Sequence, residues 1–235
     1  MENNIKVIIN SAPRSAHAWL QFLLIHELDD SRQIDIGEGN SDKFIIRSNV
    51  PIMTYAKFED IQQVTILRNP IDLLPSIITK TLGGLGNTVS SGIPMPHEYT
   101  DEPDISRLMN DQFNIYNLWL KGIEKNIDNL SVFTFEDVVN DFEFVTKHIL
   151  KFHNIECLNI KNINKDKLIE LAKNRIDVHD KGNYGFNNPI PVEQKPSIYY
   201  VVKNIIEESN RIQDALDHYK DVKYLVNKKL GRNNA

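Results

Sequence analysis

The chain has 235 residues, of which 41% are hydrophobic, and its formal net charge is −5. No Pro/Gly/Ser-rich linker or repeat divides the sequence, so we expect one domain over residues 1–230 and a polar tail at residues 231–235. The negative balance argues against a generic nucleic-acid binder, which would present a broad basic surface.

The predicted elements alternate between strands and helices. Residues 5–10 form an apolar, β-branched run that predicts a buried strand, and residues 15–28 follow as an apolar helix. Further strands are expected in three short apolar runs, at residues 44–46, 64–67 and 131–135. Further helices are expected from Pro70 onward and over residues 104–125, 142–152, 166–174, 197–218 and 219–230. This order predicts an α/β fold with a central, mainly parallel sheet, flanking helices and a helical C-terminal half.

The turn between the first strand and the first helix is a candidate anion site. It has the sequence Ser11-Ala12-Pro13-Arg14-Ser15. A turn that leads directly into a helix presents free backbone N–H groups, and the helix dipole favours a negative charge there. Arg14 adds a permanent positive charge and a planar fork of donors. The local pattern therefore predicts a cradle for a phosphate or a sulfate.

A second pattern follows the strand at residues 64–67. It reads Arg68-Asn69-Pro70-x-Asp72-x-x-x-Ser76. Arg68 leaves the end of the strand, Pro70 begins a helix, and Ser76 lies about two helical turns further on. A guanidinium and a hydroxyl placed in this way can converge on one phosphate. Because ligands gather beyond the carboxyl ends of parallel strands, Arg68 and the Pro13 turn are expected at the same edge of the sheet.

Three softer segments complete the pattern. A loop contains Lys181-Gly182-x-x-Gly185, and an aromatic strand end carries Phe135. Residues 83–103 are rich in glycine, serine and proline, which is typical of a disordered segment or of a lid over a site.

Four of these segments resemble, in their order along the chain, the sulfotransferases that use 3′-phosphoadenosine 5′-phosphosulfate (PAPS). They are the Pro13 turn, the Arg68 motif, the Phe135 segment and the Lys181 loop. The resemblance spans residues 5 to 188, and it implies a P-loop NTPase-like sulfotransferase fold, with PAPS as donor and adenosine 3′,5′-bisphosphate (PAP) as product. It implies that Arg68, Ser76, Lys181 and Gly182 bind the 3′-phosphate. It further implies that Trp19 and Phe135 flank the adenine. The 5′-phosphosulfate would be held by Pro13, Arg14, Ser15, Ala16, His17 and Ala18.

The chain departs from the family at the reacting end. Ala16, His17 and Ala18 replace a glycine and two threonines. The resemblance implies that Arg14 stabilises the bridging oxygen, and His17 can recover part of the lost hydrogen bonding. Asn49 stands where relatives have a histidine base; it can orient an acceptor but cannot take its proton. Other candidates for the base are His17, Glu38, Asp42, His97 and Glu98.

The remaining expectations concern class and surroundings. One cysteine, Cys157, excludes an intrachain disulfide and Cys-rich zinc sites, and we expect no metal. Because no run approaches a spanning helix, a soluble, cytoplasmic protein without membrane or nucleic-acid partners is expected, with a homodimer as one option for its assembly. Its acceptor would be a small molecule or a glycan. The alternatives are a non-catalytic PAP- or PAPS-binding protein and a P-loop kinase-like enzyme, although Gly-Lys-Ser/Thr is absent from the loop.

Overall fold

The structure is a computed structural model that describes residues 6–16, 19–21, 23–24, 44–48, 51, 61–83, 105–154, 170 and 197–232. Its centre is a four-stranded parallel sheet in the order β2-β1-β3-β4. The strands are β1 (Lys6–Asn10), β2 (Phe44–Ser48), β3 (Gln62–Leu67) and β4 (Ser131–Thr134). The expected α/β class with a parallel sheet is confirmed.

The strand order places a topological switch point between β1 and β3. The chain leaves β1 for β2 on one side and then returns to build β3 on the other side. Val7 pairs with Gln62 and Ile9 with Val64, so β1 and β3 end close together. In open parallel sheets, ligands bind in the crevice beyond the carboxyl ends of strands at such a point. This crevice is where the turn after β1 and Arg68 after β3 meet.

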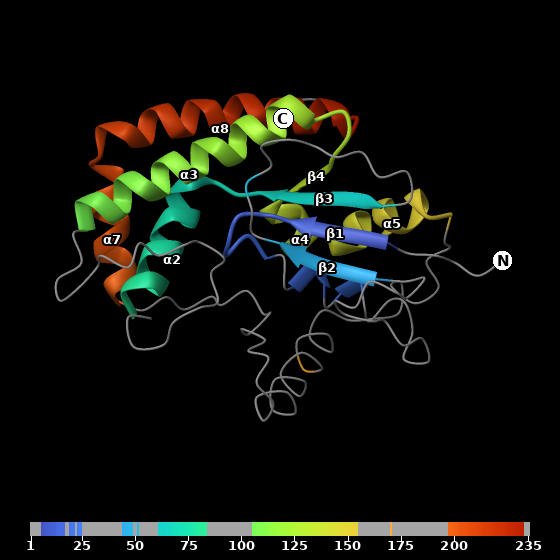
Figure 1. The fold of residues 1–235 in the computed structure, drawn as a ribbon, viewed down its shortest axis with the longest axis horizontal. Helices are drawn as coiled ribbons and strands as arrows, with labels where there is room; N and C mark the ends of the chain where they lie inside the picture. Colours follow the sequence, from blue (N-terminus) through green and yellow to red (C-terminus); the bar gives the residue numbers. More distant parts are fainter. Residues whose placement is uncertain are drawn as a thin grey trace.

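Helices surround the sheet, as Figure 1 shows. Their bounds are α2 (Pro70–Gly83), α3 (Ile105–Asn126), α4 (Phe135–Asn140), α5 (Phe142–Phe152), α7 (Ser197–Glu207) and α8 (Asn210–Lys229). Residues 19–21 and 23–24 are also helical. The continuous helix expected over residues 197–218 is wrong, because the chain breaks there and Ser209 caps α8. Of the helix expected over residues 166–174, only residue 170 lies within the described residues, and it is helical.

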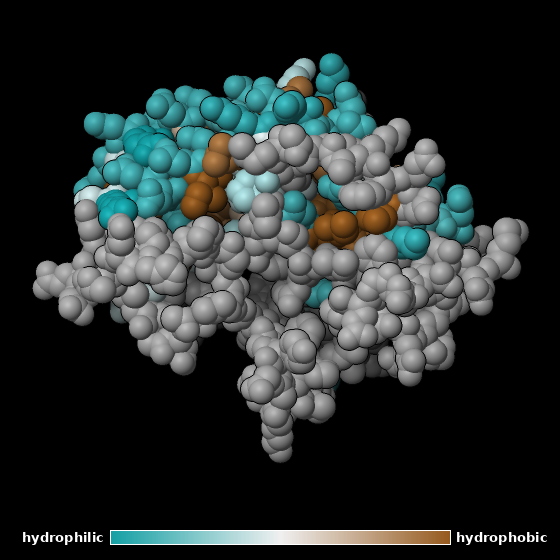
Figure 2. Space-filling model, viewed as in Figure 1, coloured by the Kyte–Doolittle hydropathy of each residue, from teal (hydrophilic) through white to brown (hydrophobic). Residues whose placement is uncertain are grey.

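Apolar side chains form a core cluster on each face of the sheet. Leu67 and Val132 face a cluster built mainly by α2, α3, α7 and α8. Ile66 and Phe133, their neighbours in sequence, face the opposite cluster, to which Trp19 and helix α5 contribute. This alternation follows from the two-residue period of a strand. Helices α3 and α8 pack side by side, and Figure 2 shows that the surface over them is largely hydrophilic. None of the described helices is long and apolar enough to cross a bilayer.

The start of α4 is held by a reciprocal cap. The Thr134 hydroxyl accepts from Asp137 N, and the Asp137 carboxylate accepts from Thr134 N at 2.8 Å. The same carboxylate pairs with Arg232 at 2.6 Å, and the Arg232 guanidinium lies 4.6 Å from the centre of the Phe144 ring. The expected strand over residues 131–135 therefore ends one residue early, because Phe135 is the first residue of α4.

The lowered pKa values of two histidines, one in α5 and one directly after it, predict how the stability of the fold depends on pH. The His148 ring packs edge-on against Phe133 at 5.4 Å, and burial and then the nearby Lys229 and Lys151 lower the His148 pKa. Burial also lowers the His153 pKa. The unfolded chain therefore binds more protons than the folded chain below about pH 6.5, so stability is full above that pH and falls as the solution is acidified.

We expect the thermal midpoint to drop by a few degrees between pH 7 and pH 5, followed by differential scanning fluorimetry. His148→Leu is expected to flatten this slope. An unchanged slope in that variant would show that His148 is not a source of the acid sensitivity.

Candidate phosphate site at the switch point

The turn after β1 is fastened to the neighbouring strand. The Ser11 hydroxyl accepts a hydrogen bond from the backbone N–H of Ile66 at 2.8 Å, and both groups are buried. Ser15 N donates to the Ala12 carbonyl at 3.3 Å, which closes the turn. Leu20 N donates to the Ala16 carbonyl at 3.0 Å, so the helix begins directly after the turn. This is the strand, turn and helix order that the sequence predicts.

Two residues of the turn adopt left-handed backbone conformations. Arg14 has a φ of 66° and Ala16 a φ of 63°. A Cβ in this region costs free energy, about 1–2 kcal/mol for an ordinary residue. Ala16 has the conformation that glycine adopts most readily, so the alanine at this position is strained.

Ala16→Gly is therefore expected to stabilise the fold. The relief of strain exceeds the added entropy of the unfolded chain, and the free energy of unfolding should rise by about 0.5–1 kcal/mol. The measurement is urea denaturation. The same change at Ala215, a buried residue in the middle of α8, is the control, and there a loss of about 1 kcal/mol is expected. A destabilised Ala16→Gly variant would contradict the assignment of strain.

The second motif builds the start of α2. The Asn69 side-chain oxygen accepts from Ile71 N at 3.0 Å, and its carbonyl accepts from Leu73 N at 2.9 Å, so Asn69 caps the helix. Pro70 occupies the first helical position, where its missing N–H costs nothing. Asp72 lies in the first turn and pairs with Lys203 of α7 at 3.3 Å. Asn69 and Pro70 are thus explained by the helix that they start, whereas Arg68 and Ser76 point to a ligand.

Three side chains from the two motifs converge. Arg14 Nε donates to the Ser76 hydroxyl at 3.3 Å, and Arg68 Nη1 donates to the Arg14 carbonyl. The Arg68 guanidinium stacks on the Phe135 ring, 4.1 Å from its centre. The Tyr116 hydroxyl of α3 donates to the Arg68 carbonyl at 2.9 Å. Three segments therefore fix the position of Arg68: the turn after β1, α3 and α4.

The electrostatics of this cluster favour an anion. Burial lowers the pKa of Arg14. Burial is also the largest influence on the pKa of Arg68, which it lowers; Asp72 acts in the opposite direction, and Arg14 adds to the lowering. Within the described residues neither guanidinium forms an ion pair, and the buried Arg68 Nε has no hydrogen-bond partner there. A phosphate or sulfate oxygen would satisfy this donor and offset the repulsion between the two cations.

The two aromatic residues expected beside the adenine have other neighbours in the described structure. The Trp19 side chain is 1% exposed and belongs to the core cluster that contains Ile66 and Phe133. The Phe135 ring lies against the guanidinium of Arg68. The contact of each with an adenine stays a prediction.

Sequence reasoning missed two partners of the motifs, Tyr116 and Lys203. Nothing local marks a tyrosine or a lysine on an amphipathic helix as a partner of a distant motif.

Several residues singled out in the sequence lie outside the described part of the chain. They are His17, Ala18, Glu38, Asp42, Asn49, His97, Glu98, Cys157, Lys181, Gly182 and Gly185. Among the described residues, no group of three His, Cys, Asp or Glu side chains could hold a metal.

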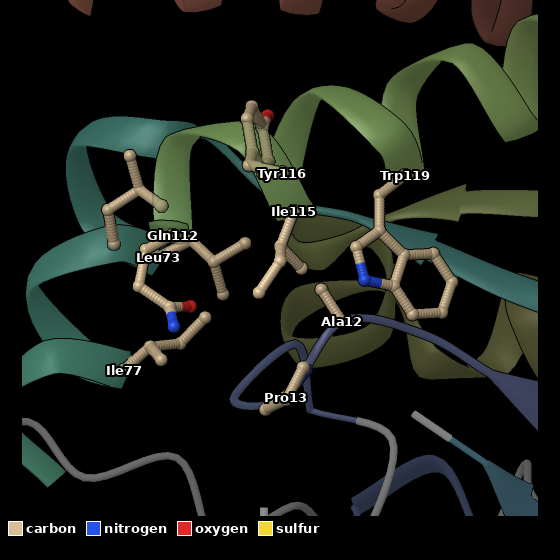
Figure 3. A pocket seen from close by; sticks show the side chains of 9 residues that line it. Ala12, Pro13, Leu73, Ile77, Gln112, Ile115, Tyr116 and Trp119 are labelled. Atoms are coloured by element: carbon tan, nitrogen blue, oxygen red, sulfur yellow. The ribbon is translucent and has the colours of Figure 1, made fainter. Parts of the chain in front are cut away.

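A pocket lies on the side of the turn that faces α2 and α3. Figure 3 shows Ala12 and Pro13 on one side and side chains of the two helices on the other. Its lining is apolar except for the side chains of Gln112, Tyr116 and Trp119. Gln112 Oε1 and Trp119 Nε1 are buried without a hydrogen-bond partner in the described structure. The cluster of Arg14, Arg68 and Ser76 thus adjoins a small, buried and mainly apolar cavity, whose lining carries one acceptor and one donor without a partner in the described structure.

No protein-family model matches the chain, and no curated protein matches its sequence. Among solved structures, the chain is similar to mouse sulfotransferase SULT7A1 complexed with PAP. The two share 15% sequence identity with a TM-score of 0.46, and the match covers 98% of this chain and 86% of that chain.

Proposed function

We propose that the chain is a sulfotransferase that uses PAPS. One observation carries the proposal: Arg14, from the first motif, and Arg68 and Ser76, from the second, meet at the switch point of a parallel sheet. Both motifs resemble phosphate-binding segments of sulfotransferases. The unpartnered Arg68 Nε is a donor of the kind that a phosphate oxygen accepts, so it supports a phosphate at this place.

The residues would divide the work as follows. When bound, PAPS would supply a sulfuryl group to an acceptor hydroxyl or amine, with PAP as the leaving group. Arg68 and Ser76 would bind the 3′-phosphate, with Lys181 and Gly182 completing that end. Arg14 would stabilise the charge that develops on the bridging oxygen, by electrostatics alone because a guanidinium stays protonated. His17 and Asn49 would orient the reacting groups.

The acceptor is proposed to be a small molecule or a glycan. Its reacting group would approach the turn at Pro13. A cytoplasmic location and a homodimer stay predictions from the sequence.

Calorimetric titration with PAP tests the nucleotide assignment. Micromolar or tighter binding of PAP is expected, together with much weaker binding of adenosine 5′-monophosphate, which lacks the 3′-phosphate. Catalysis is tested by incubating the protein with PAPS and a library of phenols, alcohols, amines and glycans, and measuring the PAP released. An absence of PAP binding would overturn the proposal.

A non-catalytic PAP-binding protein is the second candidate. Arg14 Nε is engaged with Ser76, a residue assigned to the 3′-phosphate, and an arginine held there is drawn away from the reacting end. Tight PAP binding without PAP release from PAPS in any acceptor mixture would favour this candidate.

A further inference from the structure

An ion pair links α7 to the start of α2 beside the phosphate cluster. Lys203 Nζ lies 3.3 Å from Asp72 Oδ1, although the two residues are 131 positions apart in the sequence. Helices α2 and α7 pack closely along each other. In Figure 1 both lie at the end of the molecule toward which the strands point. The pair therefore sits at the ligand-binding edge of the sheet.

Asp72 is the carboxylate of the second motif, and its charge reaches the site. It lies between Arg68 and Ser76 in the sequence, one helical turn before Ser76. Among the charges that influence Arg68, that of Asp72 is the largest, and it raises the pKa that burial lowers. Glu136 acts in the same direction more weakly. An unpaired Asp72 would hold the Arg68 guanidinium toward itself and would repel a phosphate.

Lys203 forms an ion pair with this carboxylate. Burial alone would lower the pKa of Lys203, but the hydrogen bond and the charge of Asp72 raise it overall. Glu207, one turn further along α7, lies 3.9 Å from the same ammonium. The side chain of Lys203 is 28% exposed and that of Asp72 is 47% exposed, so the pair is partly desolvated. A pair of this kind contributes little to stability, which makes an electrostatic role easier to isolate.

We propose that Lys203 is a positioning residue of the phosphate site: by pairing with Asp72 it neutralises the carboxylate that follows Arg68 in the second motif, and it thereby leaves the Arg68 guanidinium available for the anion. This inference rests on the proposed function for the identity of the nucleotide. The electrostatic step itself applies to any phosphate bound by Arg68.

The test is a mutant cycle followed by PAP titration. Lys203→Met keeps the aliphatic stem packed between the helices but removes the charge. We expect it to weaken PAP binding by about fivefold at low salt, with a smaller loss at 0.5 M salt because the repulsion is screened. Lys203→Arg is expected to bind like the wild type. The double variant Asp72→Asn with Lys203→Met should recover wild-type affinity within about twofold.

A matched pair elsewhere provides the control. Lys220 and Asp217 of α8 form an exposed pair at 2.8 Å, and Lys220→Met is expected to leave PAP affinity unchanged. Equal affinity of Lys203→Met and the wild type would overturn the inference. So would a double variant as weak as Lys203→Met, since that result indicates a purely structural link between α2 and α7.

A second probe separates this inference from the proposed function. If the wild type binds no PAP, the same variants are compared by how far inorganic phosphate raises the thermal midpoint of each. A phosphate effect that depends on Lys203 and is restored in the double variant would then support the inference while the nucleotide assignment fails. If neither probe binds, both are overturned.

Discussion

Arg68→Ala is expected to abolish most of the affinity for PAP. The guanidinium is the most constrained cation of the site, held by Phe135, by the Arg14 carbonyl and, through its own carbonyl, by Tyr116. Hydrogen bonds to charged groups contribute about 1.5–3 kcal/mol each, so the loss of the fork should weaken binding about 100-fold. Titration calorimetry measures this directly.

Two further variants help to interpret the effect of Arg68→Ala on PAP affinity. Arg68→Lys keeps the charge but not the planar fork, and an intermediate loss of about tenfold is expected. Arg211 of α8 is the control, because it is an arginine that hydrogen-bonds to Asn110 and Asn114 on the outer face of α3, and Arg211→Ala should leave PAP affinity unchanged. If Arg68→Ala binds PAP like the wild type, Arg68 does not hold the 3′-phosphate.

The parts of the site that sequence reasoning recovered are those in which chemistry and backbone signals coincide. Arg68-Asn69-Pro70 marks a strand end, a helix cap and a first helical residue within three positions, and the structure assigns each of these roles. The turn at Pro13 lies between an apolar strand and an apolar helix, so its place at the sheet edge follows from the order of elements. Local sequence is sufficient in both places.

Contacts between distant segments were not predictable in the same way. The periodicity of apolar residues continues past Ser209, which hides the break between α7 and α8, although serine is a favoured N-cap residue and its hydroxyl accepts from Arg211 N at 3.3 Å. Lys203 reaches Asp72 only because the chain folds α7 onto α2. The place of Phe135 beside an adenine was expected from the resemblance, whereas its contact with the Arg68 guanidinium could not be read from the sequence.

Trp19 shows how the surroundings of an aromatic side chain bear on the stability of the fold. Its indole is 1% exposed and packs among apolar side chains of β1, β3 and α5, including Ile9, Ile66 and Ile149. Removing a buried tryptophan leaves a cavity, and Trp19→Ala is expected to lower the free energy of unfolding by about 3–5 kcal/mol. Urea denaturation measures this loss. Tyr224→Ala, at a side chain that is 50% exposed on α8, is the control and should cost less than about 0.5 kcal/mol.

The milder variant Trp19→Leu separates packing from ligand binding. If Trp19 serves the core, the folded variant should bind PAP within about twofold of the wild type while its stability falls, since the binding groups at Arg68 and Ser76 lie beyond the sheet edge. A base–aromatic stack contributes about 1–3 kcal/mol, which corresponds to a loss of affinity of up to about 100-fold. A large loss of PAP affinity with little change in stability would show that Trp19 contacts the nucleotide. The first helix would then have to rotate so that the indole leaves the core.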